Sequence, residues 1–261
     1  MIVYDMNDDI KHRARTGDAR INPADEDGQD SPRFAPMDNR TLVERVIDQI
    51  VEAAARGMIL PGDRVVEAEV ARDLKVSRVP VREALRKLES QGIVENVPYR
   101  GMRLMDVSVA RLEKILQVRL ALEALAAEEV RQAAAADPGM LAGLDATIAG
   151  MARAARAEDR YAIAWLDTEF HRQLCELTGN EVLVRAWTPL SLQLTIIFGL
   201  STLQKELAPI VAEHEDIMAA LRSDDPARLG AVMRVHILDY CRAVDHEAFI
   251  RRMRRGKGAR A

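Results

Sequence analysis

The sequence predicts a mainly α protein with one small β-hairpin. Apolar residues recur with the helical period in three segments between residues 41 and 92 and, almost without interruption, from about residue 109 to about residue 252. Of the 261 residues, 48% are hydrophobic but only 4% are aromatic, and Ala, Leu, Arg and Glu are abundant, a composition that favours helix over sheet. The two short segments with the character of paired strands lie between residues 93 and 105.

Composition also limits the compartment and the partners of the chain. The net charge is −4, so nucleic-acid binding would require a local basic patch rather than the overall field. The two cysteines, Cys175 and Cys241, lie far apart inside helical apolar patterns and are interpreted as small buried hydrophobes of a reducing compartment. No apolar run approaches the roughly 18 residues of a membrane helix, and the polar start lacks a signal-peptide core. We expect a cytoplasmic protein without a membrane contact.

Four segments follow one another along the chain. Residues 1–38 show no helical or strand period and are rich in Asp, Arg, Gly and Pro, which predicts a disordered tail. Residues 39–106 form a first domain and residues 107–252 a second, with Asp106 to Ser108 as the linker and Ser108 as the cap of the next helix. Residues 253–261 form a basic tail.

The first domain contains three helices and a hairpin. The first helix starts near Thr41 and ends before Gly57, the second covers residues 67–74, and the third starts at Ser77 and closes at Gly92. Only a tight turn separates the second helix from the third. Two short strands, 93–96 and 102–105, flank a turn at 98–101. This order of three helices and a hairpin is that of a winged helix-turn-helix.

The third helix has the two faces that a major-groove helix needs. Its outward first turns carry Ser77, Arg78, Val79 and Arg82, whereas Val81, Leu85 and Leu88 have the spacing of an inward stripe. Basic residues outnumber acidic ones from Lys75 to Arg103. The alternative is a solvated helix face supported by pairs such as Glu83 with Lys87; the order of the elements and the basic start favour DNA binding.

These residues resemble the GntR family of bacterial transcription regulators. The resemblance rests on Leu60-Pro61-Gly62-Asp63, on the run from Val76 to Leu88, and on Gly92-Ile93-Val94, and it covers residues 41–105. It implies that Arg78 and Arg82 reach bases or phosphates and that Ser77 and Val79 lie against the duplex. It also implies that the tip, Tyr99-Arg100-Gly101, enters the minor groove. Some relatives carry an arginine where this chain has Ala68, so we expect no contact there.

The second domain is predicted as an all-α bundle of six or seven helices. The helical segments are roughly 109–135, 140–157, 159–178, 181–203, 205–221 and 226–252. Four ligand-type side chains, Asp167, His171, His214 and His236, fall on the apolar stripes of three of these helices. A single inward histidine is more often a satisfied core residue, but burying all four is costly unless a shared metal ion satisfies them.

The donor set and a second resemblance both point to a divalent metal. Imidazole and carboxylate suit Zn²⁺, with Ni²⁺ or Mn²⁺ as alternatives, and coordination beyond four leaves positions open for a carboxylate effector. Residues 109–252 resemble the FCD-type effector domain of the FadR subfamily, on segments such as Asp167-Thr168-Glu169-Phe170-His171 and Glu213-His214. The resemblance implies that the same four residues hold the ion. His12 and His246 lack such partners and are expected at the surface.

Arg119 shares the inward stripe of the helix that follows the linker. A guanidinium there can bind a small organic acid bidentately. The alternative is an internal ion pair, with Glu123 as one possible partner.

Together these features predict a metabolite-responsive transcription regulator, and a repressor in particular. We expect a homodimer whose two winged helices read a pseudo-palindromic operator and whose bundles bind a metal and a small carboxylate. One alternative is a metal-dependent hydrolase or hydratase, but Glu169 and Glu213, the available general bases, point away from the ligand face of their helices. Another alternative is a regulator whose signal is the metal itself.

Overall fold

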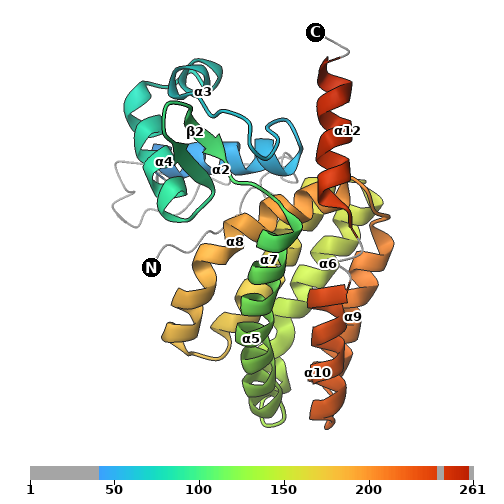
Figure 1. Ribbon diagram of the computed structural model, residues 1–261. Coiled ribbons are helices and arrows are strands. Elements are labelled where there is room, and N and C mark those ends of the chain that lie inside the picture. Colours follow the sequence, from blue (N-terminus) through green and yellow to red (C-terminus); the bar gives the residue numbers. More distant parts are fainter. Residues whose placement is uncertain (1–40, 240–243, 259–261) are drawn as a thin grey trace, which may run out of the picture. The chain divides into compact units, whose positions relative to one another are not determined.

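The computed structural model describes residues 41–239 and 244–258 (Figure 1). The predicted disordered tail, residues 1–38, lies outside the described residues, as do His12 and Cys241. The described residues belong to one compact unit. The chain is mainly α, with one two-stranded antiparallel sheet among the described residues, as predicted.

The amino-terminal part is the predicted winged helix-turn-helix. Its elements are α2 (Leu42–Ala55), α3 (Glu67–Asp73), α4 (Arg78–Ser90), β1 (Val94–Val97) and β2 (Gly101–Leu104). Helix α2 starts with a capping box, in which the Thr41 hydroxyl accepts from the backbone N–H of Glu44 and the Glu44 carboxylate accepts from the backbone N–H of Thr41. The strands pair antiparallel, with Val94 opposite Leu104 and Val97 opposite Gly101.

The hairpin tip depends on left-handed backbone. Tyr99 has φ 61° and Gly101 has φ 74°, a region that glycine enters without steric cost and tyrosine enters rarely. The Arg100 N–H closes the turn on the Val97 carbonyl at 2.9 Å. The turn therefore holds the Tyr99 side chain fully out in solvent.

The carboxy-terminal part is a helical domain. Its elements are α5 (Val109–Ala134), a 3₁₀ turn (Pro138–Leu141), α6 (Ala142–Arg156), α7 (Arg160–Glu176), α8 (Glu181–Thr202), α9 (Ala208–Leu221), α10 (Pro226–Arg234), a π-helical turn (Val235–Asp239) and α12 (His246–Gly258). Helix α7 packs against α5, α6 and α8, and α9 packs against α6 and α10; Figure 1 shows these helices side by side. The helix starts at Ser108 and Asn180 are capped by those side chains, as their residue types predict.

The last predicted helix differs from the observed structure. Instead of one helix over residues 226–252, α10 ends at Arg234, a π-helical turn follows, and α12 begins at His246 and continues to residue 258. The prediction that His246 lies at the surface is wrong, because its side chain is only 4% exposed and its Nε2 lies 3.4 Å from the Ser201 hydroxyl. Burial lowers the pKa of His246 to about 4.

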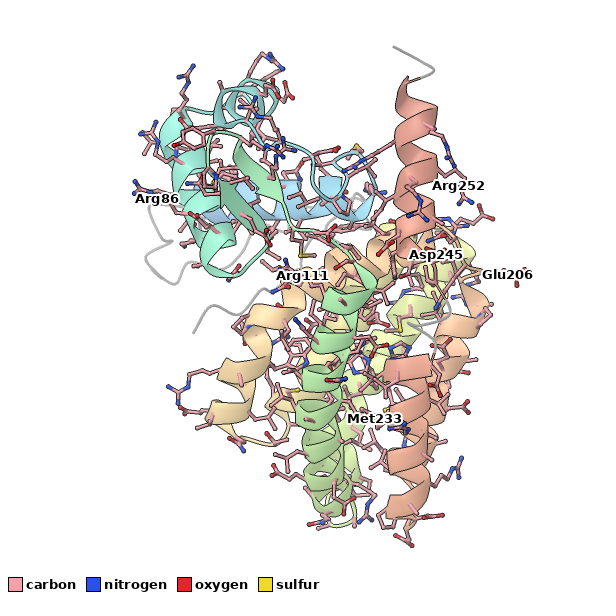
Figure 2. All side chains as sticks on the ribbon, viewed as in Figure 1. Arg86, Arg111, Glu206, Met233, Asp245 and Arg252 are labelled. Carbon is pink, nitrogen blue, oxygen red and sulfur yellow. The ribbon has the colours of Figure 1, made fainter. Side chains whose placement is uncertain are left out.

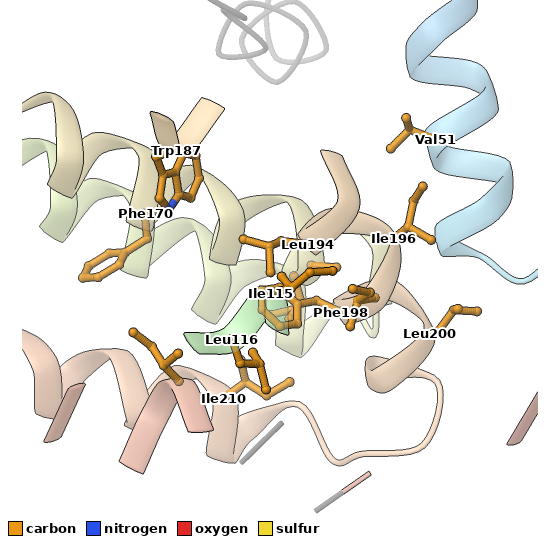
Figure 3. Packing of buried hydrophobic residues seen from close by; sticks show 14 of the residues in the cluster. Val51, Ile115, Leu116, Phe170, Trp187, Leu194, Ile196, Phe198, Leu200 and Ile210 are labelled. Carbon is orange, nitrogen blue, oxygen red and sulfur yellow. The ribbon is translucent and has the colours of Figure 1, made fainter. Parts of the chain in front are cut away.

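Helix α8 forms much of the core. Figure 3 shows its residues Leu194, Ile196, Phe198 and Leu200 with Val51 of α2 and with Ile115 and Leu116 of α5. By length and composition α8 is the one described helix that could cross a membrane, contrary to the sequence expectation that no such run exists. Its run from Leu194 to Thr202 is buried inside the protein, which is the position of a core helix.

Gly199 permits a close approach of α8 to α2. A Cβ at this position would lie 2.5 Å from the Ala55 Cβ and 2.7 Å from the Ala55 carbonyl oxygen. Contacts at that distance do not occur between real side chains, so only glycine fits. Gln193, two turns earlier on α8, donates to the Gln91 carbonyl at 2.9 Å. Helix α8 is therefore the main bundle helix on which the winged helix-turn-helix packs, with smaller contacts from α5, α7 and α12.

Candidate metal centre and DNA-reading surface

The four predicted metal ligands lie together in the helical domain. Asp167 and His171 come from α7, one helical turn apart, His214 comes from α9, and His236 comes from the π-helical turn after α10. One ligand-type atom from each residue lies within 4.8 Å of the others, and all four side chains are buried. The grouping that the apolar stripes predict is thus present in the structure.

The three imidazoles share one orientation: each has its Nδ1 facing an outer oxygen and its Nε2 toward the cluster, and of the three Nδ1 contacts the one from His214 has hydrogen-bond geometry. His214 Nδ1 lies 2.8 Å from the Ile210 carbonyl, His171 Nδ1 lies 2.8 Å from Glu123 Oε2, and His236 Nδ1 lies 3.3 Å from Glu213 Oε2. On the inner side, the Nε2 atoms of His171 and His236 are 3.0 Å apart, and His214 Nε2 lies 3.4 Å from Asp167 Oδ1. Outer acceptors of this kind fix the tautomer that leaves Nε2 free to bind a metal.

Two polar atoms at the centre of the cluster are buried without a hydrogen bond among the described residues. They are Asp167 Oδ2 and His214 Nε2. An unsatisfied buried acceptor costs free energy that a folded protein normally avoids. A cation between these atoms would satisfy both, which makes the donor set a good fit to a divalent metal.

Burial favours the neutral form of two cluster imidazoles, His214 and His236. Burial, with His171 and Arg119 adding to it, lowers the pKa of His214 to about 4 even though Asp167 opposes the shift. Burial and the adjacent His214 lower the pKa of His236 well below its usual value. Neutral imidazole is the form that ligates a metal, so no proton has to leave these two histidines near pH 7.

A small cavity adjoins the cluster. Asp167 and His236 form part of its wall, and the remaining wall residues bring two cations, one acid and two hydroxyl groups: Arg119, Lys205, Glu213, Ser201 and Thr202, together with apolar residues that include Phe198. Burial, more than the nearby Asp167, raises the pKa of Glu213 to about 7, and Lys205 opposes this rise. The cavity thus combines positive charge with access to the candidate metal ligands, which suits a small anion.

Arg119 forms the internal ion pair that the sequence gave as one interpretation, and it also lines the cavity. Its side chain is buried, and its Nε donates to Glu123 Oε1 at 2.8 Å, which is the internal ion pair. Its guanidinium also lies 4.9 Å from the centre of the Phe198 ring and lines the cavity. The pair with Glu123 therefore anchors Arg119 without removing it from the cavity wall.

The sequence did not indicate two residues around this site: Trp187 donates its indole N–H to Glu123 Oε1 at 2.7 Å, and Lys205 lines the cavity. The expectation that Glu213 points away from the ligands is wrong, because its Oε2 lies 3.3 Å from His236 Nδ1, on a neighbouring helical segment, and its side chain lines the cavity. Glu123 itself was named only as a possible partner of Arg119, although it also reaches His171. The position of Glu123, one turn after Arg119 on the inward stripe of α5, was the sequence signal for its role. The role of Trp187 has no such signal, because it depends on a contact between two helices far apart in the sequence.

The predicted DNA-reading residues of α4 lie at its exposed amino-terminal end. Ser77, Arg78, Val79 and Arg82 are all exposed, and Val79 is an apolar side chain left 62% accessible. Ser77 occupies the N-cap position, but its hydroxyl makes no capping hydrogen bond. Figure 2 shows Arg86, two turns further along α4, pointing away from the protein. Tyr99 and Arg100 are exposed at the hairpin tip.

Arg82 has a partner within the winged helix. Its Nε and Nη2 donate to the two carboxylate oxygens of Glu67 on α3 at 3.0 and 2.9 Å. This hydrogen bonding lowers the pKa of Glu67. Both side chains remain partly exposed, so the pair orients Arg82 rather than withdrawing it from the surface.

Two family models match the chain in the order of its two folded parts. Residues 42–104 match the model of bacterial regulatory proteins of the gntR family, and residues 114–239 match the FCD domain. A relative from Paenarthrobacter nicotinovorans, named "Probable D-xylose utilization operon transcriptional repressor", is 30% identical over 79% of this chain and 90% of its own length. The chain belongs to the GntR family. Its pairing with an FCD domain fits the FadR-like subfamily of GntR regulators.

A further curated relative and two solved structures are also similar to this GntR regulator. The HTH-type transcriptional repressor RspR of Escherichia coli K12 is 26% identical over 72% of this chain and 82% of its own length. Among solved structures, a GntR regulator from Rhodococcus sp. RHA1 has a TM-score of 0.64 at 19% identity, covering 77% of this chain and 96% of that one. Escherichia coli McbR/YncC has a TM-score of 0.62 at 20% identity, covering 78% and 99%. These two likenesses show the shared fold.

Membership of the GntR family distinguishes between two functions that the sequence allowed, a transcription regulator and a metal-dependent enzyme. Relatives are named as transcriptional regulators or repressors, and the chain is a non-enzymatic transcriptional regulator with a DNA-binding domain of the GntR type. The hydrolase or hydratase alternative is therefore not supported.

Proposed function

We propose that this GntR regulator is a dimeric repressor whose operator affinity depends on a divalent metal and a small organic acid bound in its FCD domain. The observation that carries the proposal is the convergence of Asp167, His171, His214 and His236, with all three histidine Nε2 atoms directed inward. The shared wall between this cluster and the cavity supports a ligand that touches the metal.

The metal would be held by three imidazole nitrogens and one carboxylate oxygen. This donor set suits Zn²⁺ best, with Ni²⁺ or Mn²⁺ as alternatives that accept more than four ligands. When bound, the ion supplies a positive charge and open coordination positions for an oxygen ligand. The protein side chains do the remaining work: they hold the ion, exclude bulk water and place the cavity cations beside it.

The effector would be a small carboxylate. Arg119 offers planar N–H donors fixed by Glu123 and Phe198, and Lys205 adds a second cation to the cavity wall. Ser201 and Thr202 supply hydroxyl groups on α8. A carboxylate that binds both the ion and Arg119 would press on α8, the helix that also packs on α2 through Gly199, and so change the placement of the DNA-reading helices.

DNA recognition would use the exposed end of α4 and the hairpin tip. Arg78 and Arg82 reach bases or phosphates, Ser77 and Val79 lie against the duplex, and Tyr99, Arg100 and Gly101 enter the minor groove. Two copies related by a two-fold axis would read the two halves of a pseudo-palindromic operator. The names of two relatives support repression, and a bacterial regulator that binds DNA would act in the cytoplasm.

The test is a binding titration on an operator selected by this protein from a random DNA library. Fluorescence anisotropy measures DNA affinity for zinc-loaded protein, with and without a panel of small mono- and dicarboxylic acids. We expect one class of acid to change the affinity by about 5- to 150-fold. The amide of the same acid serves as the ligand control, and chelator-treated protein should show no response. If no acid changes DNA affinity while zinc is bound, the effector part of the proposal is wrong.

The same titration separates a second candidate, in which the metal itself is the signal. This candidate is favoured by the completeness of the cluster, which presents four protein ligands without any organic group. A change of DNA affinity on adding zinc alone to chelator-treated protein would support it. An effect that requires the acid as well would exclude it.

A further inference from the structure

Glu123 lies at the junction of three helices of the FCD domain. Its Oε1 accepts from Arg119 Nε of its own helix α5 at 2.8 Å and from Trp187 Nε1 of α8 at 2.7 Å. Its Oε2 lies 2.8 Å from His171 Nδ1 of α7. The carboxylate is fully buried, and the helices α5, α7 and α8 thus share one buried acceptor.

We infer that Glu123 is a positioning residue of the metal centre, which fixes His171 in the tautomer that presents a free Nε2 to the ion. The inference rests on the proposed metal binding. Because Oε1 already accepts from two donors, Oε2 is the oxygen left for the imidazole. An ionised carboxylate has no proton to give, so the proton of a neutral His171 must lie on Nδ1. The lone pair on Nε2 then faces the cluster, where His236 Nε2 is 3.0 Å away.

The outer acceptors of the other two histidines differ from Glu123. His214 uses the Ile210 carbonyl, four residues earlier on its own helix, and His236 faces Glu213, which also lines the cavity. Glu123 is fully buried, and two further donors hold its Oε1. With Oε1 anchored in this way, the carboxylate keeps Oε2 beside His171 Nδ1 at 2.8 Å, so it orients His171 more strictly than a partly exposed group would.

The same carboxylate joins the metal site to the proposed anion site. Arg119 lines the cavity and is held by Glu123 Oε1, while His171 contacts Glu123 Oε2. Both sites therefore depend on one side chain that reaches neither the cavity nor the ion. Such a role would account for a buried Arg119–Glu123 ion pair at a place where apolar residues would pack without a desolvation cost.

The substitution Glu123→Gln tests the inference. The amide oxygen is the only acceptor left, and Arg119 and Trp187 both donate toward the same position, so the amide N–H₂ would face His171. We expect it to donate to Nδ1 and to force the His171 proton onto Nε2, the metal-facing nitrogen. Long-range ¹H–¹⁵N NMR of the metal-free protein distinguishes the two tautomers by their nitrogen shifts. Zinc affinity, measured by competition with a chromophoric chelator, should fall by about 10- to 100-fold.

Two further variants keep the test decisive. Trp187→Phe removes a donor to the same carboxylate without touching His171; it should lower stability but leave the tautomer unchanged and zinc affinity within about twofold. If Glu123→Gln does not fold because Arg119 is left unpaired, Arg119→Met combined with Glu123→Gln removes both charges and allows the same measurements.

The outcomes separate the inference from the proposed function. If the wild-type protein binds no zinc, the metal proposal fails, whereas the tautomer measurement on metal-free protein still stands. If the wild type binds zinc and folded Glu123→Gln binds it equally tightly, or keeps the Nδ1–H tautomer, Glu123 does not position His171. An equal loss of zinc affinity in Trp187→Phe would also overturn the inference, because general packing would then explain the effect.

Discussion

The proposed DNA-reading surface and the candidate metal centre of this regulator are built in opposite ways. The proposed DNA-reading residues lie within one short stretch, from Ser77 to Gly101, and their side chains are mostly exposed. The candidate metal ligands come from three separate helical segments and are buried. Exposed charge costs little in the folded protein, whereas buried polar groups are tolerated only with partners. The first surface should therefore tolerate substitution, and the second should couple function to stability.

The largest effect is expected from a substitution in the candidate metal centre, measured as zinc binding and as stability. His171→Ala should abolish tight zinc binding and leave operator binding by the metal-free protein close to that of chelator-treated wild type. With free zinc at about 1,000 times its dissociation constant, the ion should stabilise the wild type by about 4 kcal/mol in free energy of unfolding, and this increment should vanish in the variant. Thermal or urea unfolding with and without zinc measures it. Equal zinc contents of wild type and variant would contradict the ligand assignment.

The converse substitution tests the exposed region. Arg82→Ala should weaken operator binding by about 1–3 kcal/mol and reduce its salt dependence if the side chain contacts a phosphate. Zinc content and unfolding should be nearly unchanged, since the pair with Glu67 is exposed and such pairs contribute little to stability. Arg185→Ala, on the exposed side of α8, is the matched control. A loss of zinc in Arg82→Ala would break the proposed independence of the two regions.

The comparison also shows what sequence can and cannot predict. The winged helix was predictable element by element because its signals are local: the cap at Thr41, the turn between α3 and α4, and Gly101 at the hairpin. The four candidate ligands were predictable because each interrupts an apolar stripe. Their outer partners were harder: the contact of Trp187 with Glu123 joins residues of two distant helices, and no periodic pattern encodes it. His246 was misplaced because its burial depends on Ser201, far earlier in the chain.

Gly199 offers a way to disturb the contact between the two regions without touching either site. In Gly199→Ala the new Cβ would collide with Ala55, so α2 must move away from α8, at a cost of about 1–3 kcal/mol in unfolding free energy. We expect zinc affinity to stay near wild type and the change in DNA affinity on effector binding to shrink. Gly150→Ala, where a Cβ would meet the ends of the Leu166 and Arg153 side chains at 3.4 and 3.7 Å, is the control. An unchanged effector response in Gly199→Ala would show that coupling does not pass through this contact.

The smallest predicted effect concerns His246, a buried histidine outside the cluster. Burial lowers its pKa to about 4 in the folded protein, with Lys205 adding to the shift and Asp245 opposing it. Unfolded histidine titrates near 6.5, so between these values the unfolded chain binds more protons and stability falls as the pH falls. Wild type should lose about 1–2 kcal/mol more than His246→Asn between pH 8 and pH 5. Chelator-treated proteins, compared by urea unfolding, provide the measurement, because His214 and His236 titrate in the same direction in both and cancel. Parallel pH profiles would mean that His246 is already solvated in the folded state.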